Sequence, residues 1–162
     1  MRTAALFALT LLSSGAMAVD MRAFVRGSWQ EICAANAGQP TVMHIWGLTC
    51  APCLTELPQW AALRKERPDL NIIMLATDPL SASAADLTGV LQKAGLASGE
   101  SWAFADAFTE RLRFEIDPKW LGEMPRTILL ARDGSITAMP GLADLGAVRS
   151  WYDAETANNS RR

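Results

Sequence analysis

The chain has 162 residues, of which half are hydrophobic, and a formal net charge of −2. This length is enough for one domain with its own core, and no basic stripe of the kind that binds nucleic acid is present. The three cysteines, an odd number, do not fit a scaffold built from several disulfides. The composition therefore predicts one globular domain that has no nucleic acid partner.

The first residues have the pattern of a secretory signal peptide. Arg2 gives a positive start, residues 4–12 form an apolar run too short to span a bilayer, and residues 16–18 (Ala-Met-Ala) fit a small-x-small cleavage site. We therefore expect cleavage after Ala18. The short apolar run and the Ala-x-Ala site disfavour the alternative of an uncleaved anchor. The mature chain would then be an exported, periplasmic domain.

Apolar spacing predicts the elements of this domain, residues 19–157. Val25, Trp29, Ile32 and Cys33 recur at helical spacing and predict a helix over residues 21–36. The other expected elements are a core strand at 41–46, a helix at 53–67 kinked by Pro58, a strand at 71–76, a helix at 84–95, a short extended piece and a helix within 101–114, strands at 126–131 and 135–139, and a helix at 142–156. Residues 158–162 are expected to be a disordered tail.

This order of elements predicts the fold class. Strands that alternate with helices favour parallel pairing, and the last two strands, joined by Arg132-Asp133-Gly134, favour a hairpin. We therefore expect an α/β fold with a mixed central β-sheet flanked by helices on both faces.

Two cysteines lie between the first core strand and the next helix, in the motif Cys50-Ala51-Pro52-Cys53. A helix N-terminus favours a thiolate, the species that attacks disulfides. The spacing predicts a redox-active disulfide in which Cys50 attacks and Cys53 resolves, without a further cofactor. A zinc site of both cysteines with Cys33 and His44 is disfavoured, because His44 lies in a core strand and Cys33 on the buried face of another helix.

Three motifs carry a resemblance to a known family. They are W-x-x-x-C-x-P-C at residues 46–53, E-x-P at 56–58, and Met-Pro-Arg-Thr at 124–127 followed by a strand and the Asp-Gly pair at 133–134. With them, the chain resembles the thioredoxin fold and, more narrowly, the exported thiol–disulfide oxidoreductases of the TlpA/ResA type. The resemblance covers nearly all of the chain after residue 18.

The resemblance implies roles for individual residues. Cys50, Cys53 and Glu56 would be catalytic. The bond before Pro125 would be cis, and the backbone of Met124 would pair with the client protein. Thr49 departs from the family, in which most members carry an aromatic residue there, and this changes the surface beside Cys50. The residues expected to bind the substrate are Trp46, Thr49, Ala51, Pro52, Met124 and Pro125.

Polar residues near the cysteines allow two interpretations each. Glu56, one helical turn after Cys53, is either a solvated carboxylate or a partly buried acid that raises the pKa of the resolving sulfur and relays its proton. His44 is either a core histidine bonded to backbone or a proton acceptor behind Cys53. Cys33 is expected to be an inert buried side chain, and Arg126 is expected to be exposed or to steer acidic partners.

The resemblance implies a reductant of client protein disulfides, of the apocytochrome c maturation or copper-site assembly type. A membrane electron donor of the DsbD/CcdA type would recharge it. Two alternatives remain. The first is a disulfide-introducing oxidase of the DsbA type. The second is a copper-delivery chaperone that uses the same two thiols, since soft thiolates bind the cuprous ion.

Overall fold

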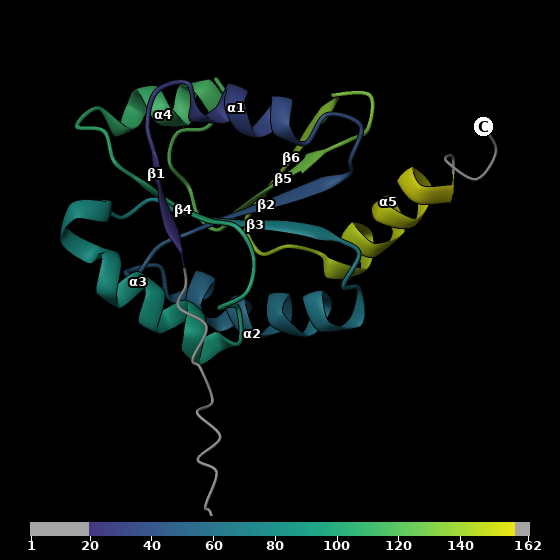
Figure 1. The fold of residues 1–162 in the computed structure, drawn as a ribbon, viewed down its shortest axis with the longest axis horizontal. Coiled ribbons are helices and arrows are strands. Elements are labelled where there is room, and N and C mark those ends of the chain that lie inside the picture. The colour runs from purple at the N-terminus through teal and green to yellow at the C-terminus, as the bar shows by residue number, and fades with distance from the viewer. Residues whose placement is uncertain (1–19, 158–162) are drawn as a thin grey trace, which may run out of the picture.

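The computed structural model describes residues 20–157, so the signal peptide and the tail expected at the two ends lie outside the described residues. The strands are β1 (Met21–Phe24), β2 (Thr41–Trp46), β3 (Asn71–Ala76), β4 (Ser101–Phe104), β5 (Arg126–Leu130) and β6 (Ile136–Pro140). They form one sheet in the order β1-β4-β3-β2-β5-β6, in which β5 and β6 run antiparallel to their neighbours and the other pairs are parallel (Figure 1). The mixed sheet expected from the sequence is confirmed.

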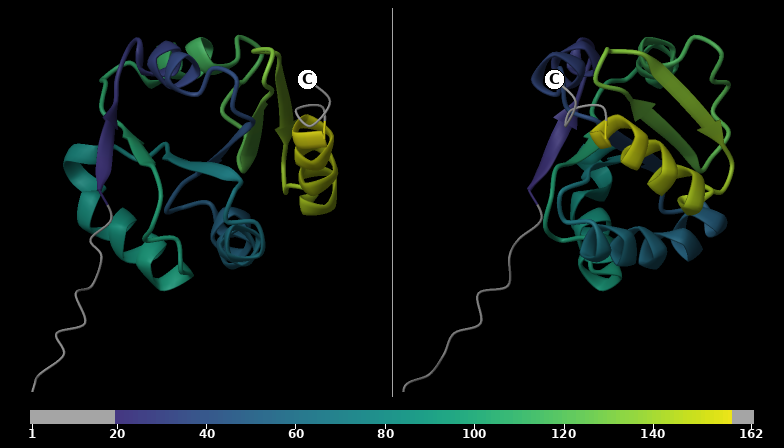
Figure 2. Two further views of the ribbon diagram at one scale, coloured as in Figure 1. Left: turned by 45° about the vertical axis from the view of Figure 1, so that its right-hand side comes forward. Right: turned by 90° about the vertical axis from the view of Figure 1, so that its right-hand side faces the viewer.

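Helices cover both faces of this sheet. They are α1 (Ser28–Ala35), α2 (Ala51–Glu66), α3 (Leu80–Ala94), α4 (Thr109–Ile116) and α5 (Leu145–Ala157). One core cluster joins the sheet to α2, α3 and α5, and a second joins its other face to α1 and α4. Figure 2 shows helices on each face of the sheet, with β1 at one edge of the sheet and β6 at the other.

The position of β2 places the site at the centre of the sheet. All six of its residues are buried, as expected for a strand covered on both faces. It pairs with β3 on one side and β5 on the other. Side chains alternate between faces, so Val42, His44 and Trp46 point toward α2 while Met43 and Ile45 point toward α1 and α4. The chain therefore leaves β2 in the middle of the domain and enters α2 directly.

The prediction of one helix over residues 21–36 is wrong for the first part of this range. Residues 21–24 form β1, which pairs in parallel with β4. Gly27 has φ of +91°, a left-handed conformation that a continuous helix cannot contain, and α1 begins after it. Ser28 Oγ accepts a hydrogen bond from the Val25 amide and closes the turn. Val25, expected on the inner face, is exposed outside the helix.

The other elements lie close to their expected places. α2 runs through Pro58 as one helix. α3 begins four residues earlier than expected, because the carbonyl of Pro79 accepts hydrogen bonds from the Ala82 and Ser83 amides and forms a first turn without an apolar stripe. The hairpin closes through the Gly134 amide bonded to the Ala131 carbonyl. Within residues 20–157, no helix has the length and apolar character needed to cross a membrane.

Candidate active site

The two motif cysteines form a disulfide at the start of α2. Their Sγ atoms are 1.98 Å apart and their Cα atoms 5.2 Å apart. Cys50 is the N-cap of the helix, and its Sγ accepts a hydrogen bond of 3.3 Å from the Cys53 amide. Pro52 is tolerated in the first turn because amides there have no partner within the helix. Cys50 is half-buried and Cys53 fully buried, so Cys50 is the more accessible sulfur.

The loop before the disulfide is held by residues that follow β3. The Leu48 amide donates a hydrogen bond of 2.9 Å to Asp78 Oδ2. The Thr77 amide donates to the Trp46 carbonyl at 3.0 Å, which extends the pairing of β2 and β3 past the strand ends. Gly47 fits closely, since a Cβ there would lie 3.1 Å from Asp78 Oδ2 and 3.4 Å from Met124 Cε. These contacts hold in place the loop that precedes Cys50.

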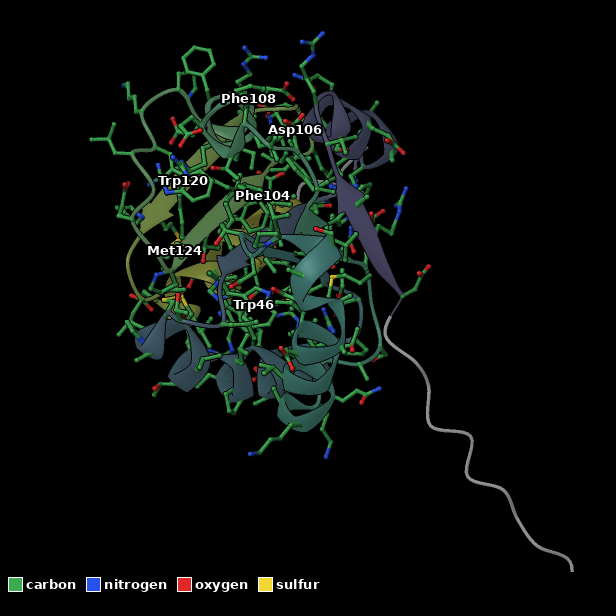
Figure 3. All side chains as sticks on the ribbon, turned by 90° about the vertical axis from the view of Figure 1, so that its left-hand side faces the viewer. Trp46, Phe104, Asp106, Phe108, Trp120 and Met124 are labelled. Carbon is green, nitrogen blue, oxygen red and sulfur yellow. A yellow bond between two sulfur atoms is a disulfide. The ribbon has the colours of Figure 1, made fainter. Side chains whose placement is uncertain are left out.

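The loop before β5 lies against the same region. The Met124-Pro125 peptide bond is cis, as the family resemblance implied. Met124 is half-buried and packs on the cluster that contains Cys53, with its Sδ accepting a hydrogen bond of 3.3 Å from Thr77 Oγ1. Pro125 is buried, and its carbonyl accepts from the Gly141 amide. Figure 3 labels Met124 and Trp46 on the side of the molecule that carries this loop.

The expected substrate-binding residues divide by exposure. Thr49, Ala51 and Pro52 are exposed beside Cys50. Trp46 has no exposed surface, and its ring lies in the core cluster of Cys53. Trp46 therefore packs in the core beneath the disulfide, while Thr49, Ala51 and Pro52 form the surface of the site.

Glu56 is a buried acid, not a solvated one. Its side chain is 2% exposed, and Oε1 accepts a hydrogen bond of 2.6 Å from the Ala143 amide in the loop before α5. Burial raises the pKa of this carboxyl, and the Ala143 amide and the Trp60 indole lower it by less. Residues three apart on a helix have Cβ atoms about 5–6 Å apart, so Glu56 lies one turn behind Cys53.

His44 faces this acid from the sheet. Its Nε2 is 3.7 Å from Glu56 Oε2, and its Nδ1 is 3.3 Å from Thr127 Oγ1 on β5. The ring packs against Trp60 at 4.8 Å between centroids. Complete burial lowers the pKa of His44 to about 3, so the imidazole is neutral near pH 7. Its hydrogen-bonding partner is thus a side chain, not the backbone expected for a core histidine.

Two other expectations need correction. Arg126 is 5% exposed and pairs with Asp117 and with Glu123, the latter at 2.7 Å, so its charge is used within the fold. Cys33 is a free thiol that is half-buried, and burial raises its pKa. It packs on the α1 and α4 side of the sheet, opposite the disulfide. Among residues 20–157, no three His, Cys, Asp or Glu side chains cluster as metal ligands.

The motifs did not indicate three residues that hydrogen-bond to the site from other parts of the chain, namely Asp78, Ala143 and Thr127. Asp78 and Ala143 belong to none of the motifs, and Thr127 belongs to the Met-Pro-Arg-Thr motif, which does not predict its contact with His44. Asp78 lies two residues after the end of β3, and the carboxyl ends of parallel strands lie at one edge of a sheet, so its position in the sequence could have indicated this contact. Ala143 contributes through its backbone, for which the sequence offers no signal.

No protein-family model and no curated protein matches the sequence. Solved structures do match. A secreted disulfide oxidoreductase of Mycobacterium tuberculosis, homologous to DsbE of E. coli, superposes with a TM-score of 0.59 at 18% identity, covering 75% of this chain and 85% of that one. A DsbF homologue from Corynebacterium diphtheriae gives a TM-score of 0.60 at 15% identity, covering 75% and 74%.

StoA from Bacillus subtilis gives a TM-score of 0.56 at 20% identity, covering 73% of this chain and 85% of that one. Identities this low establish the fold alone. With strand order, helix layers and similar structures in agreement, the chain has the thioredoxin-like fold that its motifs predicted.

Proposed function

We propose that this protein is an exported thiol–disulfide oxidoreductase that reduces disulfides in client proteins. The observation that carries the proposal is the Cys50–Cys53 disulfide at the N-terminus of α2, with the half-buried Cys50 beside the cis-proline loop. Similar structures include a protein described as a secreted disulfide oxidoreductase, which supports the same chemistry here.

The reduced enzyme would act in two steps. The Cys53 amide and the α2 dipole stabilise negative charge on the Cys50 sulfur. This thiolate attacks a client disulfide, forms a mixed disulfide and releases one client sulfur as a thiolate. Cys53 then loses its proton and attacks Cys50 Sγ, so the second client sulfur leaves with the bonding electron pair. The client gains two electrons, and the enzyme returns to its disulfide form.

The finer assignment follows from the family resemblance. On this resemblance we propose a periplasmic location after removal of residues 1–18, and clients in apocytochrome c maturation or copper-site assembly. An enzyme that ends each cycle oxidised needs an electron supply, and a membrane donor of the DsbD/CcdA type fits this need. Exposed Thr49, Ala51, Pro52 and half-buried Met124 form the surface that the client would contact.

Trapping of the mixed disulfide tests this function. Cys53→Ser removes the resolving thiol, so Cys50 should remain bonded to client cysteines and give adducts that a reductant dissolves. Cys50→Ser should give no adducts and should lose the reduction of a model protein disulfide, such as insulin. Cys33→Ser is the matched control and should behave as the wild type. Absence of Cys53→Ser adducts in cells, or adducts that form equally with Cys50→Ser, would refute the mechanism.

A further inference from the structure

Two buried polar atoms face each other one helical turn behind the disulfide. His44 Nε2 and Glu56 Oε2 are 3.7 Å apart, on side chains that are 0% and 2% exposed. Neither atom has a hydrogen-bond partner at this distance. Buried polar atoms without a partner are uncommon in folded proteins and cost free energy, so this arrangement calls for an explanation.

The other polar atoms of both side chains are already engaged. Glu56 Oε1 is held by the Ala143 amide at 2.6 Å. His44 Nδ1 lies 3.3 Å from Thr127 Oγ1, and the imidazole ring rests on Trp60. The two side chains are therefore fixed from three elements, α2, β5 and the loop before α5. The two facing atoms and the indole Nε1 of Trp60 are the buried polar atoms left without a partner in this cluster. Of these, His44 Nε2 is the one that can accept a hydrogen bond from a carboxyl O–H.

The surroundings disfavour charge on either group. From α2, His44 faces Glu56 and the ring of Trp60, from β5 the hydroxyl of Thr127, and from β3 the neutral Met74. Near the Ala143 amide, Asp144 is exposed and accepts hydrogen bonds from the first turn of α5. Among the described residues, His44 is the one basic side chain within ion-pair distance of Glu56. Burial opposes both an imidazolium and a carboxylate here.

We propose that in the disulfide form Glu56 is protonated and donates its O–H to His44 Nε2, which makes His44 the positioning residue for the acid behind Cys53. One proton between the facing atoms satisfies both of them. Closing the contact requires a movement of about 1 Å, since such hydrogen bonds are about 2.7–2.8 Å long. With Nε2 as acceptor, the imidazole proton is on Nδ1 and is donated to Thr127 Oγ1.

This arrangement deepens the proposed function and rests on it where proton transfer is concerned. In the resolving step the Cys53 thiol passes its proton to the Glu56 carboxylate as its sulfur attacks Cys50. The disulfide form is left with a neutral Glu56, and His44 accepts the hydrogen bond of this new O–H. When a donor dithiol reduces the disulfide, the proton returns to Cys53. The Glu56 carboxyl therefore takes up the proton that Cys53 loses when the disulfide forms, and gives it back when the disulfide is reduced.

Infrared titration of the oxidised protein tests the proposal. The band of the Glu56 carboxyl is isolated as the difference between wild type and Glu56→Gln, and is followed with pH. His44→Asn keeps a polar group near Thr127 but removes the atom that faces Glu56, so the protonated form loses its partner. We expect the pKa of the carboxyl to fall by about one unit, a tenfold loss of proton affinity. His44→Gln, whose amide oxygen reaches the position of Nε2, should restore it.

An unchanged or higher pKa of the Glu56 carboxyl in His44→Asn would overturn the proposal, as would a failure of His44→Gln to differ from His44→Asn. If His44→Asn does not fold, Thr127→Val carries the test, because loss of the acceptor for the Nδ1 proton should lower the same pKa by less. An unchanged value in that variant also overturns it. The titration needs no client, so it can succeed or fail independently of disulfide reduction.

A kinetic readout connects the pair to the reaction. The pH dependence of the resolving step should shift in His44→Asn, and this shift should disappear when Glu56→Gln is also present, because His44 acts through the acid. An equal shift with and without Glu56 would show that His44 acts by another route and would contradict the proposal.

Discussion

His44 is neutral in the folded protein, with a pKa of about 3 against an ordinary value of 6.5, because its ring is completely buried. Between these values the unfolded chain binds a proton that the folded protein excludes. The stability contributed by neutral His44 is therefore present above pH 6.5 and is lost as the pH falls toward 3. Glu56 acts in the opposite sense, since its raised pKa contributes stability that is lost as the pH rises through that value.

Removing the imidazole should therefore reduce the acid sensitivity of the fold. In the Glu56→Gln background, which removes the opposing titration, His44→Asn should reduce the loss of unfolding free energy between pH 7 and pH 4.5 by about 2–3 kcal/mol. Urea unfolding of the oxidised protein at the two pH values measures this difference. An unchanged loss would mean that His44 titrates normally in the folded state.

Gly47 is packed so closely that the effect of adding a side chain there can be predicted. An added Cβ would meet Asp78 Oδ2 at 3.1 Å and Thr77 Oγ1 at 3.3 Å, and Asp78 holds the Leu48 amide. Gly47→Ala should destabilise the protein by about 1–3 kcal/mol and slow the reaction of Cys50, because the loop before it must shift.

Gly89→Ala is the matched control for Gly47→Ala. Gly89 lies within α3 and is exposed, and an added Cβ would have no neighbour within 4 Å. This change should stabilise the protein by about 0.5–1 kcal/mol through helix propensity. Thermal unfolding and the rate of thiol alkylation at Cys50 after reduction compare the two variants. Equal effects at both positions would contradict the tight packing at Gly47.

At the scale of elements, β1 shows how sheet pairing overrides a local pattern. Apolar spacing alone suggested a helix from residue 21, yet β1 pairs with β4 over four residues. Phe24 has no exposed surface and stacks on Phe104 at 5.6 Å between centroids, while Trp102 meets it edge-on. A short edge strand gains its stability from such distant contacts, which no window of sequence contains.

Phe24→Ala should therefore destabilise the protein by about 3–5 kcal/mol, the cost of removing a buried aromatic side chain. Val25→Ala, the next residue, is exposed and outside β1, and it should change the unfolding free energy by less than about 0.5 kcal/mol. Urea unfolding of both variants checks the contrast. A small effect for Phe24→Ala would mean that β1 adds little to the core.

The other elements were predictable where local pattern and burial agree. β2 and β3 were found at their expected bounds because each is a run of mostly apolar residues, and the hairpin because Asp133-Gly134 marks its turn. Within the site, the cysteines and the Met124-Pro125 loop followed from motifs. The contact of His44 with Glu56 could not be predicted, because it depends on the register of β2 against α2 across the core.

At the scale of the whole molecule, the sheet separates the redox-active disulfide from the free thiol of Cys33. The disulfide, Glu56 and His44 lie on the face covered by α2, α3 and α5, while Cys33 lies on the opposite face with α1 and α4. This separation keeps the free thiol away from the reactive pair. The parallel strands bring the ends of β2 and β3 together, so the segment after β3 supports the loop before Cys50.

The central claim is that the couple donates electrons to its clients, and its reduction potential tests this most directly. Thiol trapping of the Cys33→Ser protein in defined redox buffers isolates the Cys50–Cys53 couple. We expect a value near that of thioredoxin, about −250 mV or lower, which would require an electron donor to recharge the enzyme. A value near −120 mV, typical of DsbA, would contradict the account and make the protein an oxidant of thiols.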